Sequence, residues 1–267
     1  MSSLAQRALP RRRFWWTVSD AVAITKRNLY RYIRVPPLLL FSTIQPVMFV
    51  LLFNYVFGGA IQVPGVDRYI DYLMAGILAQ TVIFGSTQTG VGLAEDMTRG
   101  MVDRFRSLPM ARSAVLAGRT LSDTVRNLFV VSLMLVVGTL IGFRFHAGVV
   151  PALGAVALAL AFGLAFSWIS AFIGLSVRDV ESAQAAGFVW VFPLVFASSA
   201  FVPVQSMPGW LQAFVRANPV TLTVNALRAL SLGGPTARPL LQSLAWVVGI
   251  LLVFVPLAIN RYRRAAG

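Results

Sequence analysis

The sequence predicts an all-α integral membrane protein with six transmembrane helices. Of its 267 residues, 57% are hydrophobic and 12% are charged, against roughly 25% charged residues in soluble domains. Six charge-free stretches approach or exceed the ~20 apolar residues that cross a bilayer. All 23 Lys and Arg and all nine Asp and Glu lie outside these stretches. The stretches are 38–57, 73–92, 127–143, 150–174, 184–202 and 242–260.

Basic residues concentrate on one side of the predicted membrane. If the N-terminus is cytoplasmic, the cytoplasmic segments hold 18 of the 23 Lys and Arg. These segments are 1–37, 93–126, 175–183 and 261–267. This is the positive-inside bias, and it explains the net charge of +14 without nucleic acid. We therefore expect a six-helix domain over 38–260, both termini in the cytoplasm and contact with anionic membrane lipids.

Residues 14–34 are expected to form an amphipathic helix at the membrane surface. Its apolar positions recur at helical spacing and are Trp15, Val18, Val22, Leu29 and Ile33. Tryptophan and tyrosine suit the headgroup zone, and Pro36-Pro37 would end the helix. The alternative is a plain basic tail that only sets topology.

Residues 93–126 are predicted to form a cytoplasmic loop containing a short helix. Apolar residues repeat every three or four positions at Met97, Met101, Phe105 and Leu108. Charged residues repeat on another face at Glu95, Arg99, Asp103 and Arg106. Pro109 would end this helix, and a second helical stretch at 111–125 leads into the third span. The segment is either a docking element for a cytoplasmic partner or a solvated connector.

Residues 203–230 are too apolar for an ordinary external loop. Pro208 and the Asn218-Pro219 pair are helix-start signals, so two short helices are expected at 208–217 and 219–230. Trp210 contributes to their apolar surface. Helices of this length cannot span a bilayer, which predicts a re-entrant hairpin. An external loop resting on the membrane is the alternative.

The chain lacks the residues that would let it power transport. A phosphate-binding P-loop needs a Gly-Lys step, and the single lysine, Lys26, follows Thr25. His146 is the only histidine and there is no cysteine, so neither a metal site nor a catalytic centre is expected. The six predicted spans contain no ionisable residue, which argues against an ion-coupled transporter. An integral membrane enzyme is disfavoured for the same reasons.

Uncharged polar residues occur inside the predicted spans. They either form hydrogen bonds between helices or line a transport path. Candidates for the path are Gln45 and Asn54 in the first span, Gln80, Thr87 and Gln88 in the second, and Ser198 and Ser199 in the fifth.

The arrangement resembles the permeases of type-2 ABC exporters, in particular the daunorubicin-resistance type of drug and lipid permease. The resemblance covers nearly the whole chain. It is carried by ED at 95–96, RFRSLPM at 104–110, Arg112, Gly118-Arg119, Asp123, SSAFVP at 198–203, MPGW at 207–210, NPV at 218–220 and ALR at 226–228.

The resemblance implies an exporter of hydrophobic or amphipathic molecules in the cytoplasmic membrane of a bacterium. Two copies of a separate ABC ATPase would bind ATP and Mg, and a second permease, identical or homologous, would complete the path. The path would lie between the first, second and fifth spans of both permeases. Implied ATPase-coupling residues are Glu95, Asp96, Arg99, Asp103, Arg104, Phe105 and Arg106. Open alternatives are a permease for lipid-linked polysaccharide and a non-transporting scaffold or immunity protein.

Overall fold

The computed structural model describes residues 19–20, 22–30, 34, 36–61, 63, 65–66, 68–100 and 112–265. Every regular element in these ranges is helical. Residues 22–30 form a helix that precedes the bundle. The further elements are α2 (Pro36–Leu52), η1 (Phe53–Phe57), α3 (Tyr69–Thr98), α5 (Arg112–Ile141), α6 (Val149–Gly174), α7 (Val180–Phe196), η2 (Val204–Ser206), α8 (Gly209–Ala217), α9 (Pro219–Leu232) and α10 (Ala237–Ala265).

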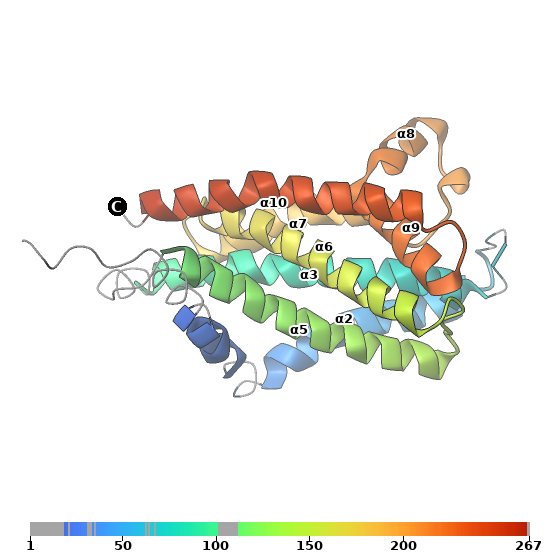
Figure 1. Cartoon of the computed structure of the whole chain (residues 1–267), viewed down its shortest axis with the longest axis horizontal. Helices are drawn as coiled ribbons and strands as arrows, with labels where there is room; N and C mark the ends of the chain where they lie inside the picture. Colours follow the sequence, from blue (N-terminus) through green and yellow to red (C-terminus); the bar gives the residue numbers. More distant parts are fainter. Residues whose placement is uncertain are drawn as a thin grey trace, which may run out of the picture.

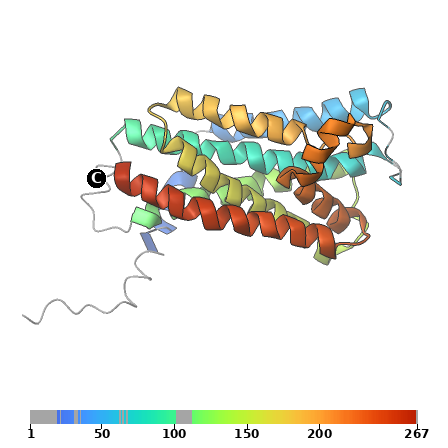
Figure 2. The same ribbon diagram turned by 90° about the horizontal axis from the view of Figure 1, so that it is seen from above.

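The long helices run side by side along the length of the molecule (Figures 1 and 2). One end of the bundle carries the C-terminus and the helix of residues 22–30, and we call it the tail end. The opposite end carries α8 and α9, and we call it the hairpin end (Figure 1). Helix α3 forms the centre, because it packs against α2, α5, α6, α7 and α9.

Four helices have the length and apolar composition needed to cross a membrane. They are Tyr69–Thr98, Val115–Ile141, Val149–Gly174 and Ala237–Arg264. Two further apolar helices, Ser42–Phe57 and Val180–Phe196, are shorter. Each of the six predicted stretches falls on one of these helices, which confirms the helical, membrane-type architecture.

One predicted boundary is wrong. The stretch 184–202 is helical only as far as Phe196, and residues 197–203 form no regular helix. Within the predicted segment 93–126, α3 continues to Thr98, and the helical stretch expected at 111–125 is the beginning of α5, which starts at Arg112. Arg119, Asp123 and Arg126 of this stretch are buried in the bundle and are not part of a solvated connector.

The helix at residues 22–30 docks on the bundle through a partly polar face. Ile24, Thr25 and Asn28 are buried, whereas Val22 and Tyr30 are exposed. The Thr25 hydroxyl donates to the Gly118 carbonyl at 3.1 Å, so this face contacts α5. Trp15, Val18 and Ile33 of the predicted amphipathic helix lie outside the described residues.

Glycines let neighbouring backbones approach α3 closely. A Cβ at Gly76 would collide with the backbone carbonyl of Ala200, and one at Gly90 with the carbonyl of Ser170. The first contact seats the non-helical segment after α7 against α3. The second seats α6.

We expect Gly76→Ala to lower the free energy of unfolding by about 1–3 kcal/mol, because the Ala200 backbone must shift to accept the methyl group. Thermal unfolding in detergent would measure this. Gly249→Ala is the matched control, since Gly249 lies within α10 with open space around it. It should be neutral or stabilising by up to about 1 kcal/mol. Equal destabilisation by both changes would contradict the close approach at Gly76.

Candidate functional site: a polar cavity between α2, α3, α5 and α7

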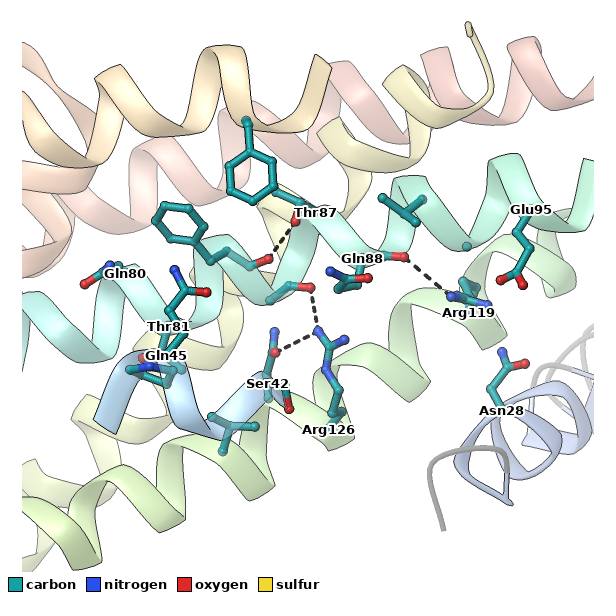
Figure 3. A pocket seen from close by; sticks show the side chains of 18 residues that line it. Asn28, Ser42, Gln45, Gln80, Thr81, Thr87, Gln88, Glu95, Arg119 and Arg126 are labelled. Atoms are coloured by element: carbon teal, nitrogen blue, oxygen red, sulfur yellow. Dashed lines mark hydrogen bonds between the residues drawn. The ribbon is translucent and has the colours of Figure 1, made fainter. Parts of the chain in front are cut away.

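A cavity of about 290 Å³ lies in the half of the bundle nearer the tail end. Helices α2, α3, α5 and α7 contribute its walls, and Asn28 of the preceding helix reaches it (Figure 3). The cavity is unusually polar for the interior of an apolar helix bundle. Its uncharged polar lining consists of Asn28, Ser42, Gln45, Gln80, Thr81, Thr87, Gln88 and Asn127.

Four of the seven predicted path residues meet at this cavity: Gln45, Gln80, Thr87 and Gln88. Gln45 and Gln88 are exposed at its rim, whereas Gln80 is buried. The other three are elsewhere. Asn54 lies in η1, and Ser198 and Ser199 are buried in the segment after α7.

Two buried side chains of the cavity carry polar atoms without a hydrogen-bond partner among the described residues. They are Oε1 of Gln80 and Oγ1 of Thr81. The side chains are 2% and 7% exposed. A buried polar atom without a partner costs about 1–3 kcal/mol, so this pair of residues is a candidate binding site. Thr81 was not predicted from the sequence, because a single threonine in an apolar helix gives no signal.

Charged residues of α3 and α5 form a network beside the cavity. Asp123 is fully buried, and the Thr89 hydroxyl donates to its carboxylate at 2.6 Å. Arg119 lies 3.6 Å and Arg126 3.9 Å from the same carboxylate. Arg119 also lies 3.9 Å from Asp96. Two arginines thus share the buried Asp123, while Asp96 adds a second negative charge.

The glycines of α3 make room for these arginines. A Cβ at Gly92 would collide with the Arg119 guanidinium, and one at Gly85 with the side chain of Asn127. The Arg126 guanidinium donates to the Gly85 carbonyl and, at 3.2 Å, to Asn127 Oδ1 (Figure 3). The expectation that no ionisable residue lies within a span is therefore wrong, because Arg119, Asp123 and Arg126 fall inside the candidate span Val115–Ile141.

The predicted coupling residues Glu95, Asp96 and Arg99 lie at the tail end, where α3 terminates. Glu95 pairs with the exposed Arg99 at 2.7 Å, whereas Asp96 turns toward Arg119. Asp103, Arg104, Phe105 and Arg106 lie outside the described residues, so their coupling role stays a prediction.

Phenylalanine rings close the hairpin end of the gap between α2 and α7. Phe49 of α2 contacts Phe196 of α7 with ring centroids 6.3 Å apart. Phe53 stacks on Phe201 at 4.4 Å, and Phe196 stacks on Phe201 at 5.3 Å. These rings connect α2, α7 and the segment after α7 on the hairpin side of the cavity.

The non-helical segment 197–203 is held by side chains of α3 and α9. The Arg228 guanidinium donates to the carbonyls of Ser199 at 2.6 Å and Ala200 at 3.3 Å. Tyr69 donates to the Phe201 carbonyl at 2.7 Å. Irregular backbone inside a membrane protein needs such partners, because lipid offers none. This role of Arg228 was not predicted from the sequence.

The predicted helix pair at 203–230 is present as α8 and α9. Asn218 caps α9 through a 2.8 Å bond from the Val220 amide, and Pro219 occupies the first helical position. The Asn218 amide also donates to the carbonyls of Leu194 and Ala197, each at 2.7 Å. Pro208 precedes α8, and Trp210 is 78% exposed.

The fold and the cavity define a class of helical protein that crosses the membrane several times. Short helices lie at one end of the bundle, and a polar cavity lies in the half nearer the other end. No group of three or more His, Cys, Asp or Glu side chains suited to a metal ion occurs in the part of the chain that the structure describes. The profile of the ABC-2 type transporter family matches residues 20–232. The chain belongs to this family.

Relatives extend over most of the chain. A daunorubicin resistance ABC transporter permease, DrrB1 of Streptomyces coeruleorubidus, is 33% identical over 92% of this chain and 88% of its own length. A probable doxorubicin resistance ABC transporter permease, DrrC of Mycobacterium tuberculosis, is 30% identical over 93% of this chain and 90% of its own. A putative transport permease, ycf38 of Cyanophora paradoxa, is 24% identical over 80% and 74%. The chain is thus a multi-pass membrane permease of the ABC-2 type.

Proposed function

We propose that this permease exports drugs or similar amphipathic molecules from a bacterial cell, driven by a separate ABC ATPase. The observation that carries the proposal is the family membership, together with relatives named for daunorubicin and doxorubicin resistance. The polar cavity within an apolar bundle gives such molecules a place to bind. Two ATPase copies with ATP and Mg would act on a pair of permeases, each supplying half of the path.

The proposed topology has six crossings and places the tail end in the cytoplasm. Four helices are long enough to span alone. Helix α2 continues into η1 as far as Phe57, which lengthens the first crossing. Helix α7 is extended by the segment 197–203, whose carbonyls are satisfied by side chains. Arg261, Arg263 and Arg264 at the end of α10 favour the cytoplasmic side for the tail end.

Transport is the direct test of this function. The chain would be co-expressed with a candidate ABC ATPase from the same organism, and doxorubicin accumulation in the cells would be measured by fluorescence. We expect lower accumulation than in cells with a catalytically inactive ATPase, and co-purification of permease and ATPase in equal amounts. A stable ATPase complex without doxorubicin export would favour lipid-linked polysaccharide as the cargo. A permease that binds no ATPase would support the scaffold alternative.

The end of α3 is the proposed contact with the ATPase. Arg99 and Glu95 form an ion pair at the tail end, next to the 100–111 segment that connects to α5. Asp96 connects this end to the buried network through Arg119. A push on this segment would therefore reach the charged side of the cavity.

We expect Glu95→Ala to reduce ATP-driven export and drug-stimulated ATP hydrolysis about tenfold, the effect of losing one charged hydrogen bond. Glu181→Ala is the matched control, because Glu181 is an exposed glutamate at the start of α7, at the same end. Unaltered coupling in Glu95→Ala, or an equal loss in both variants, would contradict the assignment. Thermal stability of each variant distinguishes lost coupling from misfolding.

A further inference from the structure

The gap between α2 and α7 forms a cleft that is closed at one end. Both helices pack on α3. Toward the hairpin end they are joined by the Phe49–Phe196 ring contact. Toward the tail end Gln45 of α2 and Phe188 of α7 both line the cavity. The ring contact thus joins α2 and α7 on the hairpin side of the cavity.

The polar atoms without a hydrogen-bond partner lie in the buried part of the cavity, which we call its floor. At the rim Gln45 and Gln88 are exposed, and Phe188 is 42% exposed. At the floor the buried Gln80 and Thr81 each present an oxygen without a partner among the described residues. Both come from consecutive positions of α3 and line the same cavity. A ligand hydroxyl group could donate to the Gln80 oxygen, and a ligand hydroxyl or carbonyl oxygen could accept from the Thr81 hydroxyl.

The charges that line the cleft are balanced by neighbours. Glu95 pairs with Arg99 at 2.7 Å, and Arg119 and Arg126 share Asp123. An ionic ligand would gain little over water from such a site. Selection therefore falls to hydrogen-bonding groups without charge, such as hydroxyl and carbonyl groups.

An apolar surface accompanies these polar groups. Phe84 of α3 and Phe188 of α7 have ring centroids 6.0 Å apart at an interplanar angle of 54°. Both rings line the cavity, and Val91 and Val130 add aliphatic surface. Rings at this position can pack against a planar apolar part of a ligand. The volume of about 290 Å³ is near the lower limit of small-molecule sites, roughly 300 Å³.

We propose that this cleft is the entry site for the cargo within a single permease chain. Gln80 and Thr81 bind its uncharged hydroxyl- or carbonyl-bearing part, while Phe84 and Phe188 contact its planar apolar part. The inference deepens the proposed function and rests on it for the nature of the cargo. The residues that carry the proposal all belong to one chain, so binding can be measured on the permease by itself.

Binding of doxorubicin to the full-length chain in lipid nanodiscs tests the site without the ATPase. Its polycyclic planar part is fluorescent and carries hydroxyl and carbonyl groups, so fluorescence polarisation reports the Kd. We expect Thr81→Val and Gln80→Leu each to raise the Kd about five- to tenfold. Ser170→Ala and Ser231→Ala are matched controls, because these buried hydroxyls also lack a partner among the described residues but do not line the cavity. Both control variants should bind doxorubicin with the Kd of the unaltered chain.

A third variant covers the case in which a floor substitution impairs folding. Gln45→Trp changes an exposed residue at the rim, where a larger side chain blocks entry without disturbing the core. We expect it to abolish saturable binding. Failure of the unaltered chain to bind saturably, or unchanged binding in all three variants, would overturn the site and leave a cavity that holds only water or lipid.

The failure of the site and the failure of the proposed function remain distinguishable. ATP-driven export of doxorubicin, with a Kd unaffected by the three variants, would reject the site and keep the exporter. Binding that depends on Gln80 and Thr81 in a chain that recruits no ATPase would keep the site and reject the exporter.

Discussion

Replacing Arg228 with methionine is expected to lower the free energy of unfolding by about 3–5 kcal/mol. The substitution removes the donors to the Ser199 and Ala200 carbonyls, and a buried acceptor without a donor costs about 1–3 kcal/mol. It also removes the 3.2 Å bond to the Tyr72 carbonyl and the stacking of the guanidinium 3.4 Å above the Tyr72 ring. The non-helical segment after α7 would lose its main connection to α9.

Arg228→Lys should also be less stable than the unaltered chain, because a lysine ammonium group cannot replace the planar guanidinium, which donates to several carbonyls at once. Arg216→Met is the matched control, since Arg216 lies exposed on α8 and bonds only to Gln212 among the contacts observed. Thermal unfolding in detergent, followed by circular dichroism, would measure all three variants. If Arg228→Lys were as stable as the unaltered chain, a simple positive charge would suffice and the fork geometry would not matter.

The hairpin could be predicted because its signals are local. An Asn-Pro pair is typical of a helix start, with asparagine as the N-cap and proline as the first helical residue. Asn218 and Pro219 occupy those positions. The helical spans could be predicted for a similar reason, since the lack of charge over some 20 residues is a property of the sequence itself. Neither inference needs knowledge of what lies next to the segment.

The buried charges could not be predicted because their environment is set by distant residues. Arg119, Asp123 and Arg126 lie within eight residues of each other, and such a density of charge is typical of a segment exposed to water. Their spacing of four and three residues places them on one face, but the facing residues that accept them, Thr89, Gly85 and Gly92, lie on α3. The same limit applies to the cavity, where Gln80 was a candidate and its neighbour Thr81 was not.

The end of α7 shows how tertiary contacts override an apolar pattern. Residues 197–202 contain no charge and extend the predicted span, yet the helix stops at Phe196. The Asn218 side chain donates to the carbonyls of Leu194 and Ala197. The Arg228 side chain donates to the Ser199 carbonyl, and Tyr69 donates to the Phe201 carbonyl. These partners lie 20 or more residues away in sequence and supply the bonds that a continued helix would have made.

Asp123→Leu is expected to destabilise the bundle by about 3–5 kcal/mol, the usual cost of removing one partner from a buried ion pair. The carboxylate is fully buried and lies within 4 Å of the two arginines. Its removal leaves Arg119 and Arg126 as neighbouring like charges without the carboxylate that they share, and it takes the acceptor from the Thr89 hydroxyl. Because α5 contacts the helix of residues 22–30, we expect that helix to loosen as well, which hydrogen exchange would detect.

Asp179→Asn provides a matched control for removing one negative charge. Asp179 is exposed at the start of α7, where hydrogen bonds from Ser182 hold the pKa of its carboxyl below the usual value. An asparagine can still cap the helix, so a much smaller loss of stability is expected than for Asp123→Leu.

A double-mutant cycle of Asp123→Leu with Arg126→Met measures the coupling between the two charges. Removing both partners should cost less than the sum of the single changes. Additive costs would show that the attraction between Asp123 and Arg126 does not contribute to stability.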